Sequence, residues 1–248
     1  MKIALVQLDA DDNLWRLSAM RNLLQHVEAA DLVVFPECMP FDKAIPIAEA
    51  EAYLAELTSH NPAHAVIAGG YVLESGMERN AVFLSYRGGI LGRYFKRLLW
   101  QEPKIANGEE PTLFKWSDKS CIPLICADAA DNPSPTGSRM MYEAICLGAG
   151  EHVPIVVSSY GAWLNEPYWQ VPLQTWARGC GAPLLICGIS GHGADFEDGE
   201  KPGNYGGGGS GVFWPDERLP WQRHPRCILM IDIKTGLTTS RSIPRNCG

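Results

Sequence analysis

The sequence predicts an α/β protein in which layers of helices pack on layers of strands. Short apolar runs typical of buried strands alternate along the chain with segments whose apolar residues recur at helical spacing. With 248 residues, the chain is long enough to bury a sizeable core. Hydrophobic residues make up 46% of the chain and charged residues 20%, which is ordinary for a globular protein. We therefore expect one domain over residues 1–248.

The first half of the chain predicts two helices and five strands. Residues 14–27 carry leucine, methionine and valine at helical spacing, with Asp12 or Asn13 placed to cap the start. Residues 48–57 are rich in alanine, glutamate and leucine, which favours a second helix. Apolar runs predict strands at residues 2–8, 32–35, 65–73, 80–86 and 90–94. Two glycines before the last run indicate a hairpin there.

The second half repeats the alternation. Helices are predicted at residues 138–147, with Ser138 as the cap, and at residues 169–180. Strands are predicted at residues 122–125, 155–158, 184–187 and 227–233. The glycine-rich segment 202–211 has the composition of a linker, but the chain after it is too short for a second domain.

Charge and hydropathy exclude several classes of partner. The chain has 21 Lys and Arg against 28 Asp and Glu, for a net charge of −7, whereas nucleic-acid binding requires clustered basic residues. No stretch approaches the roughly 20 apolar residues of a membrane span, and the first apolar run is too short for a signal peptide. We expect neither nucleic acid nor membrane as a partner.

The cysteines and histidines predict a reduced protein without a metal. The eight cysteines form no CxxC pair, and several lie in strand-like runs, which favours a cytoplasmic location. The six histidines show no HExxH pattern or spacing with cysteine that suits a metal. The glycine-rich segments lack the features of phosphate or dinucleotide loops, so no cofactor is expected.

Three reactive side chains stand at the ends of apolar runs. Glu37, Lys96 and Cys126 each follow a predicted strand, and together they supply a carboxylate, an amine and a thiol. A thiol becomes a strong nucleophile when a base takes its proton and a cation stabilises the negative charge that forms. The non-catalytic alternatives are that Glu37 lies at the rim of a loop, that Lys96 lies on an edge strand and that Cys126 is a buried core cysteine.

The order Glu, Lys, Cys after apolar strands resembles the nitrilase or carbon–nitrogen hydrolase superfamily. The resemblance extends from residues 2–7 to residues 227–233 and includes a late strand and turn at 210–216. Residues 94–100 are similar to the family pattern Tyr-x-Lys-x-x-Leu-Phe/Trp, in which Lys96 takes the lysine position. The resemblance implies a four-layer αββα sandwich; periodicity alone does not separate this fold from a doubly wound sheet.

The resemblance also implies roles for these residues. Cys126 is the expected nucleophile, Glu37 the general base, and Lys96 with the backbone N–H of Ala127 the oxyanion site. Family members often carry a second glutamate after the lysine, for which Glu102 is the candidate. Glu109 and Glu110 are the alternatives.

Departures from the family pattern narrow the range of expected substrates. Relatives that bind a substrate carboxylate have arginine shortly after the nucleophile, where this chain has Ala129 and Ala130; Arg139 or Arg178 is left to replace it. Nitrilases usually follow their cysteine with Trp-Glu, where this chain has Ala-Asp. The family's usual histidine two positions after the lysine is replaced by Leu98. These differences favour an amidase for a small amide over a nitrilase or an N-carbamoyl amidohydrolase.

Other hypotheses remain open at this point. A Cys–His hydrolase would pair Cys126 with His152 or His192 but would leave Glu37 and Lys96 unexplained. A non-catalytic family member would serve as a scaffold. The resemblance further implies a homodimer, or a higher homo-oligomer built from it, formed through the helices at residues 138–147 and 169–180, both rich in large apolar side chains.

Overall fold

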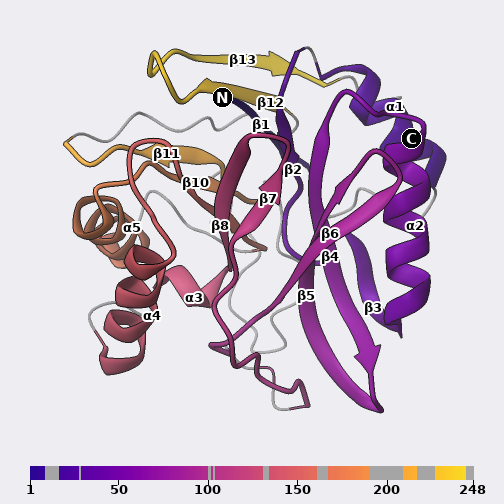
Figure 1. Ribbon diagram of the computed structural model, residues 1–248, viewed down its shortest axis with the longest axis horizontal. Helices are drawn as coiled ribbons and strands as arrows, with labels where there is room; N and C mark the ends of the chain where they lie inside the picture. Colours follow the sequence, from indigo (N-terminus) through magenta and orange to yellow (C-terminus); the bar gives the residue numbers. More distant parts are fainter. Residues whose placement is uncertain are drawn as a thin grey trace, which may run out of the picture.

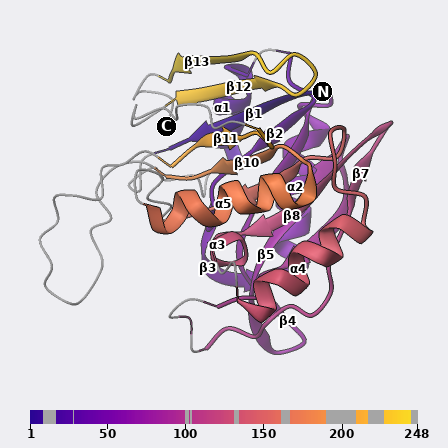
Figure 2. The ribbon, with the colours of Figure 1, turned by 90° about the vertical axis from the view of Figure 1, so that its left-hand side faces the viewer.

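The computed structural model forms two β-sheets packed face to face, with helices on each outer side (Figure 1). Seen from the side of α4 and α5, these helices lie in front of the second sheet (Figure 2). The predicted four-layer αββα sandwich is confirmed. The residues described are 1–8, 17–27, 29–99, 102, 104–130, 134–160, 167–189, 209–216 and 227–243.

The first sheet has eight strands. In order across the sheet, seven of them are β13 (Thr238–Ser242), β12 (Cys227–Asp232), β1 (Lys2–Gln7), β2 (Leu32–Val34), β4 (Ala65–Glu74), β5 (Met77–Tyr86) and β6 (Gly89–Phe95). The eighth, β3 (Pro40–Pro46), pairs with β4. Strands β1, β2 and β4 are parallel, and β5 and β6 follow β4 as antiparallel hairpins. Strand β6 therefore runs in the same direction as β2.

The second sheet has five strands, of which the central three are parallel. The order is β11 (Gly211–Phe213), β10 (Leu184–Cys187), β9 (Ile155–Ser158), β8 (Lys119–Ile125) and β7 (Phe114–Trp116). Strands β8, β9 and β10 are short, and apart from Ser158 at the end of β9 their buried residues are apolar, as expected for parallel strands covered on both faces.

Helices cover the outer face of each sheet. The first sheet packs against α1 (Leu17–Gln25) and α2 (Ile47–Ser59), and the second against α4 (Pro135–Cys146) and α5 (Pro167–Cys180). A single turn of helix, α3 (Ala127–Ala130), follows β8 directly. Among the described residues, no helix combines the length and the apolar character needed to cross a membrane.

Alternation along β1 shows how the layers are held together. Ile3 and Leu5 belong to the apolar cluster between the two sheets, whereas Ala4 and Val6 belong to the cluster beneath α1 and α2. Successive strand residues point to opposite faces, so an uninterrupted apolar run can serve both interfaces. The strand ends that carry the reactive residues are thus fixed by two packed layers.

The structure corrects the predicted start of one helix. Helix α4 begins at Pro135 rather than at Ser138, and its N-cap is Ser134, whose hydroxyl accepts a hydrogen bond from the Gly137 N–H at 3.0 Å. Proline at the first helical position suits its fixed φ. The sequence did not predict β3, β7, β13 or α3. The proposed caps Asp12 and Asn13, together with residues 202–208, lie outside the described residues.

Candidate active site

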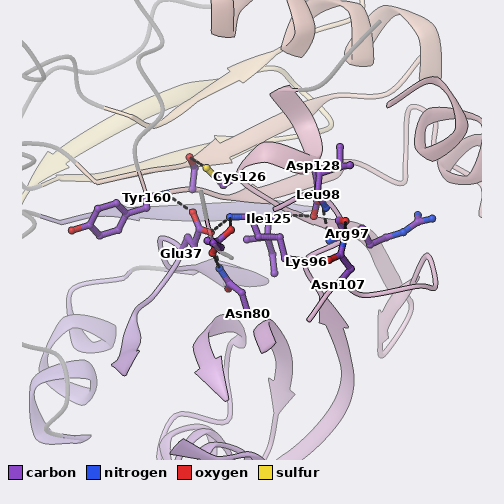
Figure 3. A network of polar contacts seen from close by, with 12 residues as sticks. Glu37, Asn80, Lys96, Arg97, Leu98, Asn107, Ile125, Cys126, Asp128 and Tyr160 are labelled. Carbon is purple, nitrogen blue, oxygen red and sulfur yellow. Dashed lines mark hydrogen bonds and ion pairs between the residues drawn. The ribbon is translucent and has the colours of Figure 1, made fainter. Parts of the chain in front are cut away.

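The predicted reactive residues meet at the carboxyl ends of three strands. Glu37 follows β2, Lys96 follows β6 and Cys126 follows β8. Since β2 and β6 run in the same direction within one sheet, their carboxyl ends lie at the same edge, and the end of β8 reaches it from the second sheet (Figure 3). The side chains of Glu37 and Lys96 are only 3% and 4% exposed.

Lys96 forms ion pairs with two carboxylates. Its Nζ lies 2.8 Å from Oε1 of Glu37 and 2.7 Å from Oε2 of Glu102. Glu102, the predicted second glutamate, therefore lies in the site, whereas the alternatives Glu109 and Glu110 are exposed to solvent. Charge-assisted hydrogen bonds of this kind are the stronger ones, and they fix the ammonium in one place.

Two residues that the sequence analysis missed tie the carboxylates to the sheet. Asn80 Nδ2 donates to Oε1 of Glu37 at 2.8 Å and to Oε1 of Glu102 at 3.1 Å. The Tyr71 hydroxyl donates to the same oxygen of Glu102 at 3.2 Å. Tyr71 on β4 and Asn80 on β5 are directly paired across the hairpin, so the two strands between β2 and β6 supply the donors that hold the carboxylates.

The electrostatics of this cluster keep Lys96 protonated. Burial alone would lower the pKa of the ammonium, but the negative charges of Glu37 and Glu102 and its interaction with Cys126 raise the pKa of Lys96 well above its ordinary value. Lys96 is therefore a permanent cation at neutral pH, and it stands where a negative charge forming near Cys126 would be stabilised.

Cys126 occupies a strained turn between a strand and a helix. Its φ is +44°, in the left-handed region that non-glycine residues rarely adopt. Strand β8 ends at Ile125 and helix α3 begins at Ala127, so Cys126 is the single residue between the strand and the helix. The Cys126 N–H donates to the carbonyl of Ser158 at 2.8 Å, so the end of β9 holds the turn.

The surroundings of the thiol keep it neutral at rest. Burial and the neighbouring Glu37 carboxylate raise the pKa of the Cys126 thiol to about 12, against the opposing effect of Lys96. A thiol with this pKa reacts as a nucleophile only if a base removes its proton during attack. Glu37 is oriented for that task because its other oxygen, Oε2, accepts the Tyr160 N–H at 3.0 Å.

Ser159 is a further missed residue at the thiol. Its hydroxyl donates to Cys126 Sγ at 3.5 Å, and this hydrogen bond lowers the pKa of the thiol. Ser159 is fully buried and directly precedes Tyr160, so one segment after β9 contacts both the thiol and the Glu37 carboxylate. No local pattern in the sequence indicates this, because the two contacts span 33 and 123 residues.

The structure separates the other candidates from this site. His152 is exposed and precedes β9, at the opposite end of the parallel pair β8–β9 from Cys126. The hypothesis of a catalytic Cys126–His152 pair is therefore wrong. Arg139 and Arg178 are exposed on α4 and α5, and Arg139 pairs with Glu143. His192 lies outside the described residues. Within the described ranges, no cluster of His, Cys, Asp or Glu is suited to hold a metal ion.

Solved structures share this architecture along nearly the whole chain. An amidase from Nesterenkonia sp. AN1, in a variant with the acetamide moiety of fluoroacetamide on its active-site cysteine, is 18% identical with a TM-score of 0.70. The alignment covers 94% of this chain and 89% of the amidase. Another variant of it, in complex with butyramide, is 19% identical with a TM-score of 0.68, at 94% and 90% coverage. That amidase belongs to the nitrilase superfamily.

This chain has the nitrilase-superfamily fold. A glutamine-dependent NAD+ synthetase from Acinetobacter baumannii shows the same fold at 16% identity, with a TM-score of 0.69. The alignment covers 98% of this chain and 48% of the synthetase. No protein-family model matches the sequence. No curated protein matches it either. The nitrilase-superfamily fold is thus recognised from three-dimensional similarity.

The Ser159 contact predicts how fast the resting thiol reacts. Removing the hydroxyl in Ser159→Ala should raise the Cys126 pKa, so the thiolate fraction below that pKa falls. Since a hydrogen bond contributes about 0.5–1.5 kcal/mol net, alkylation of Cys126 by iodoacetamide at pH 9 should slow by about two- to tenfold. Peptide mapping separates Cys126 from the exposed Cys146. Ser158→Ala is the matched control and should leave the rate unchanged; equal effects of both variants would contradict the assignment.

Proposed function

We propose that this chain is a cysteine-dependent hydrolase of non-peptide C–N bonds, an amidase for small amides. The observation that carries the proposal is the buried cluster in which Lys96 bridges Glu37 and Glu102 beside the Cys126 thiol. Base, cation and nucleophile are the three groups that acyl transfer through a thioester requires. The nitrilase-superfamily fold and the Nesterenkonia amidase that shares it support this proposal.

In the first half of the proposed reaction, Cys126 Sγ attacks the amide carbonyl carbon as Glu37 takes the thiol proton. The developing oxyanion is held by the Lys96 ammonium and the backbone N–H of Ala127. Glu37 then passes its proton to the nitrogen, the C–N bond breaks, and ammonia or an amine leaves. Groups held rigidly in a water-poor site stabilise such a charge far better than water does.

In the second half, Glu37 removes a proton from a water molecule, which attacks the thioester carbonyl. Lys96 and the Ala127 N–H again hold the oxyanion. The thioester bond breaks, the sulfur recovers a proton from Glu37, and a carboxylic acid leaves. Glu102 keeps the ammonium in place in both halves through its 2.7 Å contact. The cycle uses neither a metal nor a cofactor.

The surroundings of Cys126 favour an uncharged amide as the substrate. Ala129 and Ala130 of α3 are buried and apolar, at the positions where carboxylate-binding relatives have arginine. Arg139 and Arg178 are both exposed on the outer helices. This supports an amidase over an N-carbamoyl amidohydrolase. The residue pair after the cysteine, Ala127-Asp128, supports an amidase over a nitrilase.

An ammonia-release assay distinguishes these substrate classes. Short aliphatic amides, N-carbamoyl amino acids and aliphatic nitriles are compared at equal concentration. We expect ammonia from the amides. Release confined to the nitriles would indicate a nitrilase, and release confined to the carbamoyl compounds would indicate an N-carbamoyl amidohydrolase. A scaffold protein would release none, and its Cys126 would not form an adduct with a substoichiometric thiol reagent.

Substitution of Cys126 tests whether it is the nucleophile. Cys126→Ala should abolish ammonia release and leave the thermal unfolding temperature nearly unchanged, because the partly buried Cys126 lies at the margin of the apolar core, at the end of a strand. Cys146→Ala, which removes an exposed thiol on α4, is the control and should keep full activity. Residual turnover in Cys126→Ala would show that another group is the nucleophile.

We also propose that two copies of the chain pair through α4 and α5. Large apolar side chains are exposed on both helices: Tyr142 is 67%, Ile145 44% and Val171 61% exposed. Such side chains on adjacent helices mark an interface, and two-fold pairing of identical surfaces is the most common assembly. The family resemblance supports the same helices.

Light scattering measures the assembly. At micromolar concentration we expect a mass of about 54 kDa, twice the 27.2 kDa of one chain. Tyr142→Asp should shift the mass toward one chain, because it places a charge in the interface. Leu237→Asp, at an equally exposed apolar residue between β12 and β13, should leave the dimer intact. A mass near 27.2 kDa for the unmodified protein would refute the pairing.

A further inference from the structure

Asp128 is a buried carboxylate that the proposed reaction does not use. It lies in α3, two residues after Cys126, and is fully buried. Among the described ion pairs none involves Asp128, and the nearby Arg97 guanidinium pairs instead with Glu143. A buried charge of this kind is retained only if hydrogen bonds compensate it.

The hydrogen bonds of Asp128 connect two separate parts of the chain. Its Oδ1 accepts the backbone N–H groups of Arg97 at 3.0 Å and Leu98 at 2.7 Å. Its Oδ2 accepts the Tyr94 hydroxyl at 2.8 Å and the backbone N–H of Ile125 at 3.0 Å. Figure 3 shows Asp128 between the segment after β6 and the end of β8.

These partners flank the two residues whose separation matters for the reaction. Three of them lie within two positions of Lys96, and the fourth directly precedes Cys126. The four hydrogen bonds thus join the two segments through one side chain. One carboxylate therefore fixes the strand end that carries the ammonium against the turn that carries the thiol.

We propose that Asp128 is a positioning residue that sets the distance and orientation of Lys96 relative to the Cys126 thiol. This inference rests on the proposed function of these two residues. The carboxylate cannot act as the base itself, because its four lone-pair sites are filled by four donors. An amide at this position would place its NH2 group against backbone N–H or hydroxyl donors, so Asn cannot replace it.

Burial raises the pKa of Asp128 to about 6, although the four hydrogen bonds oppose this shift. The carboxylate is therefore ionised at pH 8, where all four bonds can form. Measurements at pH 8 compare the variants with Asp128 in this state.

The test is a double-mutant cycle of Asp128→Asn and Lys96→Met with two measured quantities. The first is kcat for a short aliphatic amide. We expect Asp128→Asn to lower kcat by at least about tenfold and KM to change less than about threefold, because misplacement of reacting groups affects the transition state most. In the Lys96→Met background the same change should cost less than about threefold, because no ammonium is left to position.

The second quantity is the rate of Cys126 alkylation by iodoacetamide, which needs no turnover. Lys96 lowers the thiol pKa, so a displaced ammonium should slow alkylation in Asp128→Asn and have no further effect with Lys96→Met. If Asp128 acted only through its charge, its removal would speed alkylation. If the unmodified protein hydrolyses no amide, the proposed function fails while the alkylation cycle still tests Asp128.

Two further variants keep the outcome decisive. Tyr94→Phe removes one of the four bonds without changing charge and should give a smaller loss of the same pattern; it replaces Asp128→Asn if that variant does not fold. Ser85→Ala removes the hydrogen bonds of a buried serine elsewhere on β5, and it should lower the unfolding temperature without changing kcat or alkylation. If Asp128→Asn lowered kcat by the same factor with Lys96 present and with Lys96→Met, the inference would be overturned.

Discussion

The contact of the Lys96 ammonium with the carboxylates of Glu37 and Glu102 is the interaction on which the rest of the site depends. Its contacts with Glu37 and Glu102 are 2.8 and 2.7 Å long, in a place with almost no access to water. Removing one partner of a buried ion pair typically costs about 3–5 kcal/mol, because the remaining charge stays unpaired. Burial and the neighbouring Glu37 carboxylate raise the pKa of the Cys126 thiol and keep it protonated at rest.

The fold can hold such a cluster because four strand ends converge on it. Strands β2 and β6 bring Glu37 and Lys96 from the first sheet, and β8 and β9 bring Cys126 and the Ser158–Tyr160 segment from the second. Each strand is anchored by apolar packing on both faces, so the polar ends have little freedom. Asn80 and Tyr71 fill the gap between β2 and β6 with directed hydrogen bonds. The apolar layers thus supply the rigidity and the polar residues supply the orientation.

Local patterns in the sequence were sufficient for most strands and for the strand-end residues, whereas the four-layer arrangement was predicted from the family resemblance. Buried strands such as β9 and β10 were predicted with their observed bounds, because a continuous apolar run bounded by turn residues has few other interpretations. Short elements such as β7 and α3 carry too few residues to show a period. Strand β3 begins and ends with proline, a residue that is rare inside strands, so the sequence does not indicate a strand there.

The partners of the reactive residues could not be predicted in the same way. Asn80 was visible only as a polar residue at the start of an apolar run, and its bond to Glu37 spans 43 residues. Asp128 offered a signal that the sequence analysis missed: a carboxylate three residues after a buried strand must find donors. Ser159 offered none, because its contact with Cys126 arises only when β8 and β9 are paired.

The kinetics of Lys96→Met test the central claim most directly. Methionine keeps roughly the side-chain volume and removes the charge, and Lys119→Met on the surface is the matched control. For hydrolysis of a short amide, kcat should fall by at least about a hundredfold in Lys96→Met and stay unchanged in the control. An unchanged kcat with only a higher KM would contradict the account, because Lys96 would then bind the substrate without stabilising the transition state.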